Sequence, residues 1–198
     1  FGSQGEKPSH PELLDWLAVS FFEDDHWSMK KSLRRIVLSA TYRQSTVVNP
    51  KSAEVDPRNQ FLWRHPGHRL GAEMIRDQAL AISGLLSEKR LGIHVRPFQP
   101  ETFWRKSAGQ SETYYVPSQG EDAYRRGVYT LWRRNAHYPG FANFDAPDRS
   151  ACVVKRDISN TPLQALTLLN DPVYVEFAGA FGKRIAKEGG DGLDERLE

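Results

Sequence analysis

The sequence predicts a mainly α-helical domain, with about five helices around one core and a small β-hairpin or short strands inserted between residues 112 and 156. Apolar residues recur at helical spacing in four segments, and strong start signals precede most of these segments. The alternation typical of a strand is short and occurs essentially once. Hydrophobic residues make up 39% of the 198-residue chain, which is enough apolar mass for one sizeable core.

The first two helices begin a helical part that we expect over residues 9–88. A Ser-x-x-Glu capping box at residues 9–12 starts the first helix. This helix should end near residue 24, because the two acidic residues there are poor neighbours for a helix C-terminus. Ser28 is expected to cap the second helix, which has a basic face beside its apolar stripe. We interpret that face as solvated rather than as a phosphate site. Its cations are Lys30, Lys31, Arg34 and Arg35.

A loop rich in proline turns separates these helices from a third, which is expected over about residues 70–86. Ile75 and Ile82 lie on the apolar face of this third helix. In the loop, His65 and His68 are three positions apart, a spacing that a metal could use. The intervening Pro-Gly pair prevents a helical ligand arrangement, and no third ligand stands at motif spacing. We therefore expect no metal site.

Residues 89–156 are expected to form an irregular insertion. Proline, glycine and serine are frequent in its first half. Val128, Thr130 and Trp132 alternate with their neighbours in the manner of a strand. Residues 114–116 are the candidate partner strand, and the two segments together would make the hairpin.

A second helical part is expected over residues 157–188. Thr161, Pro162 and Gln164 form a capping box, and the Asn170-Asp171-Pro172 run restarts the chain as a last helix, which a pair of glycines ends. The predicted core is made of residues on the apolar faces of all these helices. They are Trp16, Leu17, Leu33, Ile36, Val37, Ile75, Ile82, Leu166, Leu169 and Phe177.

Both ends of the chain are expected to be cut edges. Residues 1–8 are predicted to be a tail, and residues 189–198 the start of a truncated segment. The chain has no initial Met and no signal-peptide pattern. We therefore expect a single domain cut from a longer, multidomain protein. No apolar run is long enough to span a membrane.

Common catalytic and cofactor motifs are absent from the sequence. It contains no Gly-x-Ser-x-Gly elbow, no Walker loop and no Gly-x-Gly-x-x-Gly fingerprint. The single cysteine, Cys152, excludes an internal disulfide, a cysteine-based metal cage and covalent haem attachment within this chain. Because valines follow it, we expect a buried, inert thiol. The sequence thus favours a non-enzymatic chain that carries no cofactor of its own.

Two turns rich in polar residues carry the candidate site. Asp145 and Asp148 are the candidate catalytic residues, either as a general acid/base pair or as Ca²⁺ ligands. An architectural alternative also explains these turns, because such side chains cap helices and tight turns. In this alternative Arg149 is a buried cation bonded to Asp145 or Asp171. The candidate ligand-binding residues are Arg149, Asn160, Asn170, Asp171, Arg133 and Arg134.

Four motifs, in the same order, carry a resemblance to a known family. They are residues 9–18, residues 39–45, residues 144–149, and residues 160–166 with 169–172. The chain resembles a bacterial domain of unknown function best known from planctomycetes. That domain is the C-terminal part of long exported proteins that also carry planctomycete cytochrome c-like modules. The resemblance implies an exported or periplasmic location and places any haem elsewhere in the parent protein. It implies no reaction.

Three functions compete. The first is a non-catalytic interaction module of a larger exported, cytochrome-linked protein, whose partners are the neighbouring domains. The alternative is a polysaccharide hydrolase or lyase that uses Asp145 and Asp148 and binds carbohydrate on exposed aromatic rings. The second alternative is nucleic-acid binding through an arginine-rich surface, against which the net charge of only +2 argues. The arginines of that surface are Arg34, Arg35, Arg125, Arg126, Arg133 and Arg134.

Overall fold

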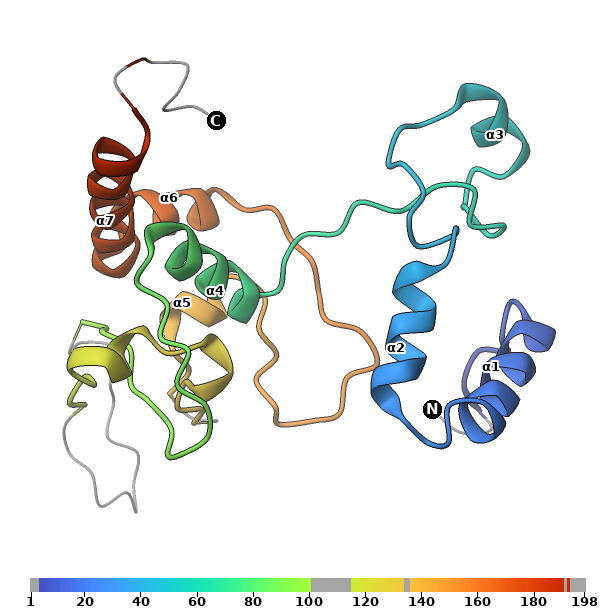
Figure 1. Ribbon diagram of the computed structural model, residues 1–198, viewed down its shortest axis with the longest axis horizontal. Helices are drawn as coiled ribbons and strands as arrows, with labels where there is room; N and C mark the ends of the chain where they lie inside the picture. Colours follow the sequence, from blue (N-terminus) through green and yellow to red (C-terminus); the bar gives the residue numbers. More distant parts are fainter. Residues whose placement is uncertain (1–3, 101–114, 134–135, 191, 193–198) are drawn as a thin grey trace. The chain divides into compact units, whose positions relative to one another are not determined.

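The chain divides into two compact units, Phe1–His68 and Arg69–Glu198 (Figure 1). The structure is a computed structural model that describes residues 4–100, 115–133, 136–190 and 192. Both units are built from helices, as predicted for a mainly α fold. No helix among the described residues combines the length and the apolar character that crossing a membrane requires.

The first unit holds the helices α1 (Pro11–Glu23), α2 (Met29–Leu38) and α3 (Pro50–Val55). Ser28 caps α2 as predicted, because its hydroxyl accepts the N–H of Lys31. The capping box predicted for α1 does not form, since His10 is the cap residue and its side chain makes no capping bond. Helix α3 was not expected, because its six residues are too few to show a helical apolar period.

Polar contacts of one arginine hold α1 and α2 together in the first unit. The guanidinium of Arg35 on α2 forms ion pairs with Asp25 at 2.9 Å and with Asp24 at 3.4 Å, both just after α1. The same guanidinium lies 5.5 Å from the centre of the Trp16 ring. These contacts fix α2 against α1 through one side of each helix, and the apolar side of α2 takes no part in them.

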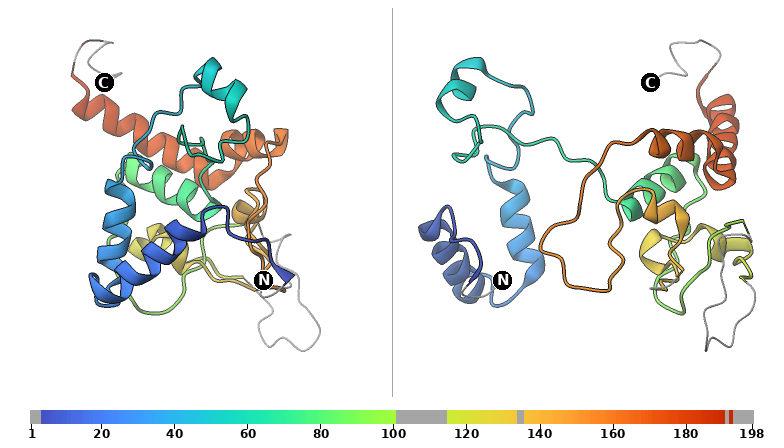
Figure 2. Two further views of the ribbon diagram at one scale, coloured as in Figure 1. Left: turned by 90° about the vertical axis from the view of Figure 1, so that its right-hand side faces the viewer. Right: turned by 180° about the vertical axis from the view of Figure 1, so that it is seen from behind.

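The second unit is built around α4 and α7, which pack against each other, with α6 packed on α7 and α5 on α4 (Figures 1 and 2). The predicted capping box of α6 forms, with Thr161 and Gln164 as its two members. Asp171 caps α7 by accepting the N–H of Val173 at 2.9 Å. The elements of this unit are α4 (Ala72–Ser83), η3 (Gly120–Tyr124), η4 (Gly127–Tyr129), α5 (Pro139–Ala142), α6 (Pro162–Asn170) and α7 (Pro172–Glu188).

The core lies in the second unit, and most of the predicted core residues are not part of it. Of those residues, Phe177 is buried, whereas Leu17 and Ile75 are half-buried. A helical period identifies an apolar face but not whether another element covers that face. The predicted core residues found exposed are Trp16, Leu33, Ile36, Val37, Ile82, Leu166 and Leu169. The buried core cluster consists of Ala72, Leu80, Tyr138, Phe141, Phe144, Val173, Tyr174 and Phe177.

The β-hairpin or short strands predicted between residues 112 and 156 do not form in the described part of that range, residues 115–133 and 136–156. Within the described ranges only isolated parallel bridges occur, one of them between Val95 and Thr130. Gly127 gives the physical reason. Its N–H donates to the Asp77 carboxylate at 2.6 Å, and a Cβ atom on Gly127 would lie 3.0 Å from the backbone of Glu73. This close docking on α4 turns the chain into η4, where a strand would run straight on.

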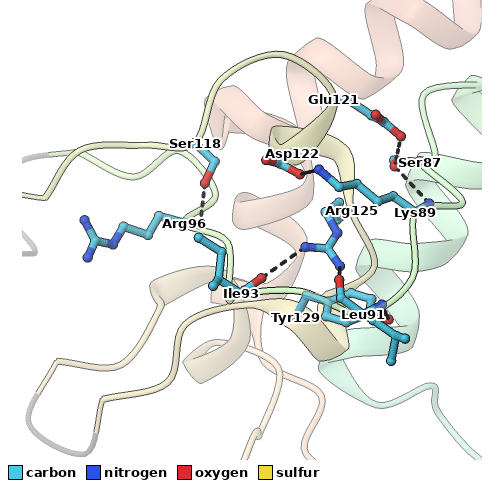
Figure 3. Close-up of polar contacts among 10 residues, drawn as sticks. All are labelled: Ser87, Lys89, Leu91, Ile93, Arg96, Ser118, Glu121, Asp122, Arg125 and Tyr129. Atoms are coloured by element: carbon cyan, nitrogen blue, oxygen red, sulfur yellow. Dashed lines mark hydrogen bonds and ion pairs between the residues drawn. The ribbon is translucent and has the colours of Figure 1, made fainter.

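A buried arginine fixes the segment that leads to this docking point (Figure 3). The side chain of Arg125 donates to the carbonyl oxygens of Leu91 and Ile93, and its guanidinium lies 3.9 Å from the centre of the Tyr129 ring. Arg125 is only 1% exposed, so these carbonyl dipoles and the ring face replace the water that the cation loses on burial. Nearby, Lys89 pairs with Asp122 at 2.9 Å.

A second buried arginine, Arg76, lies inside the core of the same unit. Its Nη2 donates to the carbonyl of Ala123 at 2.7 Å, and its guanidinium lies 5.5 Å from the ring centre of Phe177. The positive charge of Arg76 also acts on the nearby Tyr138 phenol. Burial raises the pKa of Tyr138 to about 12, so this phenol stays protonated at neutral pH. Arg76 therefore joins α4, η3, α5 and α7.

Two leucines distinguish the observed core from the predicted one. Leu80 on α4 is 0% exposed, whereas Leu169 on α6 is 72% exposed. We predict that Leu80→Ala lowers the free energy of unfolding by about 2–5 kcal/mol, because it leaves a cavity in the core. Leu169→Ala should change that free energy by no more than about 0.5 kcal/mol. Chemical denaturation of both variants measures this, and equal losses would contradict the observed core.

Candidate functional site

Helix α6 separates two hollows in the surface of the second unit. Gln164 faces one hollow and Leu166 faces the other. We call them the Gln164 cavity, which has a volume of about 230 Å³, and the Leu166 groove, which has a volume of about 300 Å³. The Gln164 cavity is lined by Arg69, Leu70, Gly71, Ile75, Phe144, Asp145, Lys155, Arg156, Asp157, Ile158, Ser159 and Gln164.

A polar network centred on the buried Gln164 amide forms one wall of the Gln164 cavity. The amide oxygen accepts from Arg69 Nη1 at 2.6 Å. The amide nitrogen donates to the Ser159 hydroxyl at 3.1 Å and to the Asp145 carboxylate at 3.3 Å. Arg69 also donates to the carbonyl of Ser159. The network thus links the segment before α4, the turn at Asp145 and the start of α6.

Asp145 is the anion of this network. Its carboxylate accepts the Ser159 N–H at 2.7 Å and the Ser159 hydroxyl at 2.8 Å. The hydrogen bond from the Ser159 N–H is the main reason that the pKa of Asp145 lies below its ordinary value. The residue has a φ of 58°, in the left-handed region that aspartate and asparagine tolerate better than most residues. Asp145 therefore closes a loop of the chain onto α6 as a fixed carboxylate.

An ion pair joins Arg156, a lining residue of the cavity, to Glu73 in the first turn of α4. Gly71 caps α4 without a side-chain bond, and the Glu73 carboxylate in the first turn accepts from Arg156 at 2.7 and 3.1 Å. Burial alone would raise the pKa of Glu73, but the hydrogen bonds and the charge of Arg156 lower it below its ordinary value. The pair draws the Cys152–Asp157 segment towards α4.

The remaining lining determines what the Gln164 cavity can bind. Leu70, Ile75, Phe144 and Ile158 supply apolar walls, while exposed charges of both signs stand at the rim. Such a hollow fits a small ligand group with an apolar body and a polar end. Among the described residues, no group of three or more histidine, cysteine, aspartate or glutamate side chains is placed to hold a metal.

The Leu166 groove lies on the opposite side of α6. The side chains of Leu163, Leu166 and Phe98 are exposed there. The polar residues at its end are occupied by the backbone, because Asn170 donates to the carbonyl of Leu166 at 3.1 Å and Asp171 caps α7. The groove is lined by Phe98, Gln99, Pro100, Tyr138, Pro139, Gly140, Asn143, Leu163, Leu166, Thr167, Asn170, Asp171 and Pro172.

The two candidate catalytic carboxylates do not line the same hollow. Asp145 lines the Gln164 cavity, whereas Asp148 is exposed and lines neither hollow. The Asp148 carboxylate accepts the N–H and the hydroxyl of Ser150 at 2.9 and 2.7 Å. These hydrogen bonds, led by the one from the N–H, lower the pKa of Asp148 below its ordinary value. Asp148 thus caps its own turn, whereas Asp145 holds the segment before α6.

The buried ion pair expected for Arg149 is wrong. Arg149 is exposed, and its guanidinium lies 4.5 Å from the centre of the Trp132 ring. A φ of 60° places the residue in the left-handed region. The guanidinium therefore makes a cation–π contact with the indole ring where an ion pair with a carboxylate was expected. Trp132 holds the same turn from the other side, because its indole N–H donates to the carbonyl of Asp148 at 3.2 Å.

The other candidate residues are dispersed. Asn160 is exposed just before α6 and lines neither hollow, Arg133 is half-buried, and Arg134 lies outside the described residues. Cys152 is exposed rather than buried as predicted, because the valines after it are themselves exposed. Residues 9–18 and 39–45, which also carry the family resemblance, lie in the first unit and line neither hollow.

Sequence reasoning missed Arg69, Arg156, Ser159 and the second role of Gln164. The capping box identifies Gln164 only as a helix cap, although its amide also holds three groups of the cavity. Arg69 lies about 90 residues along the chain from its two acceptors, so no local pattern identifies it. The available signal was compositional: a polar glutamine on an otherwise leucine-rich helix start.

The lowered pKa of Asp145 makes the stability of the folded chain depend on pH in the acid range. The folded-state pKa of Asp145 is lower than the ordinary 3.8, so its carboxylate stabilises the fold above that pH. The stabilisation is lost as the pH falls through the folded value. We predict that Asp145→Asn lowers the melting temperature at neutral pH and flattens its decline between about pH 5 and pH 2.

Asp145→Ala is the companion variant. It also loses the charge but adds backbone strain at a φ of 58°, which asparagine tolerates. It should therefore melt at a lower temperature than Asp145→Asn throughout that pH range. Thermal melts at a series of pH values measure both effects. An unchanged acid decline in the two variants would show that Asp145 does not carry this interaction.

Comparison with known proteins supplies a family but no reaction. No curated protein and no solved structure matches the chain. A protein family described as PSD1, a protein of unknown function (DUF1553), matches residues 1–198, and therefore covers both units and the two hollows beside α6. The chain thus belongs to the PSD1 family of proteins of unknown function (DUF1553).

Proposed function

We propose that this chain is a non-catalytic interaction module of a larger, exported, cytochrome-linked bacterial protein. The observation that carries the proposal is the Leu166 groove. It is a ready-made apolar hollow on the second unit, with Leu163, Leu166 and Phe98 exposed along it. Contiguous exposed apolar side chains with a polar rim are typical of surfaces that another protein covers.

The polar end of the groove supports a protein partner rather than a reaction. Asn170 and Asp171 are bonded to the backbone of their own helices, so they shape the rim without offering a reactive group. A neighbouring domain of the parent protein would place apolar anchor side chains between Leu163 and Leu166. Buried anchors of this kind supply most of the affinity of an interface.

The carboxylates give little support to the polysaccharide hydrolase or lyase. Glycosidic cleavage needs one carboxylic acid that stays protonated near neutral pH, and so needs a raised pKa. The pKa values of Asp145 and Asp148 are both shifted in the opposite direction by local hydrogen bonds. Carbohydrate binding without cleavage remains compatible with the exposed rings.

The arginines give little support to nucleic-acid binding through the surface first considered. Arg125 is buried and bonded to carbonyl groups, and Arg35 is paired with Asp25. These side chains are not available to phosphate. The exported location and the haem of neighbouring modules rest on the planctomycete resemblance alone and are part of the proposal.

The test is a double variant in the groove, Leu163→Ser with Leu166→Ser. The partner is the flanking segment of the parent protein, produced separately, and binding is measured by isothermal titration. Loss of two apolar anchors should weaken the affinity by at least about ten-fold. The matched control is Leu169→Ser, on the same helix but outside the groove, which should bind normally. Unchanged affinity in the double variant would overturn the proposal.

A further inference from the structure

Helix α2 is amphipathic, with a strongly basic polar side. Four of its five apolar residues follow the spacing of one helix face, and each of the four is at least 41% exposed. The fifth, Leu38, lies among the cations. Its cations lie beside this face, as Lys30 does, or opposite to it, and no acidic residue interrupts them. The four residues of the apolar face are Met29, Leu33, Ile36 and Val37, and the cations are Lys30, Lys31, Arg34 and Arg35.

Helix α1 does not cover the apolar side of α2 within the first unit. The contacts between the two helices run through Arg35, which reaches Asp24, Asp25 and the Trp16 ring. Arg35 lies two positions after Leu33 and two before Val37, and a step of two residues turns the helix by about 200°. The side that holds Leu33 and Val37 therefore faces away from α1.

An exposed indole stands beside the start of α2. Trp27 is 66% exposed, and its ring meets Phe21 and Phe22 edge-on at 5.4 and 5.7 Å between ring centres. Its backbone has a φ of 62°, which is rare for a bulky side chain. The Trp27 N–H bonds to the carbonyl of Phe21 at 3.0 Å and holds this conformation. A strained backbone that keeps a large apolar ring in solvent points to a function for the ring.

The surrounding segment has a single sign of charge. Residues 26–53 contain no aspartate and no glutamate, although the whole chain has 25 acidic residues. The cations in this segment are Lys30, Lys31, Arg34, Arg35, Arg43 and Lys51. Asp24 and Asp25, just before this segment, are paired with Arg35, which leaves Lys30, Lys31 and Arg34 beside the apolar side of α2. This combination suits a partner with negative charge and an apolar interior.

We propose that α2 and Trp27 bind the surface of an anionic lipid bilayer, with α2 lying in the interface plane. The apolar side of α2 would enter the acyl boundary, and Trp27 would lie at headgroup level. Lys30, Lys31 and Arg34 would contact the lipid phosphates. This mode of binding needs no membrane-spanning helix. Nucleic acid offers the charge but no apolar phase for Leu33, Ile36 and Val37, so it fits the surface less well.

The experiment is co-sedimentation of the 198-residue chain with vesicles. One set is phosphatidylcholine, and the other is an equal mixture of phosphatidylcholine and phosphatidylglycerol. We expect binding to the anionic vesicles and at least about ten-fold weaker binding to the neutral ones. Removing two cations with Lys30→Gln and Lys31→Gln should weaken anionic binding by about ten-fold or more. Leu33→Ser should also weaken it, because the apolar face is lost.

Matched controls separate lipid binding from general charge and from folding. Lys183→Gln with Lys187→Gln removes two exposed cations from α7 and should bind the vesicles normally. Circular dichroism melts check that all variants are folded. The tryptophan emission of the native chain should shift to the blue on vesicles, and most of that shift should disappear in Trp27→Phe. Equal binding to both vesicle types would overturn the proposal. So would full competition by an oligonucleotide together with normal binding of Leu33→Ser.

Discussion

The second unit depends on a guanidinium that is buried without a carboxylate partner among the described residues. Arg76 is 2% exposed, it contacts the carbonyl of Ala123 and the ring of Phe177, and its charge acts on the Tyr138 phenol. An unpaired charge in an apolar interior is costly, so each of these neutral partners must stay in place. Because they come from η3, α7 and the start of α5, one side chain on α4 fixes the relative positions of three other elements. Arg125, also buried, fixes the Leu91–Ile93 segment in a similar way, by donating to the carbonyl groups of Leu91 and Ile93.

The helices could be predicted where their signals were local. The caps at Ser28 and Thr161 follow from side chains that satisfy backbone groups within three residues, and both form. The equally local capping box at residues 9–12 does not form, although the helix itself does. The short helices α3 and α5 escaped prediction because they span too few residues to show a period. The strand expected at Val128 failed for a different reason. Its alternation was real, but the docking of Gly127 on α4 is a tertiary contact that the local pattern does not contain.

The candidate site was only partly accessible to sequence reasoning. The polar turn at Asp145 was correctly singled out, since its residue types are those that bond to backbone groups. Its partner Ser159 was not identified, and the cavity wall also needs Arg69, which is distant in sequence from Gln164. For Arg149, the residue type alone suggested a carboxylate partner, but the Trp132 ring accepts the cation instead. The choice between an anion and an aromatic face depends on chain geometry.

The position of α6 between the two hollows limits how the protein can change over generations. A helix of nine residues behaves as a single stiff rod, so a substitution that displaces its Leu166 side also displaces its Gln164 side. A shift of the α6 backbone therefore changes both hollows together. A substitution on α6 that preserves one hollow must change a side chain that faces the other hollow, without moving the helix. Selection that acts on one hollow therefore also limits the substitutions that α6 can accept at the other, so the leucines of α6 and its buried glutamine are expected to vary together.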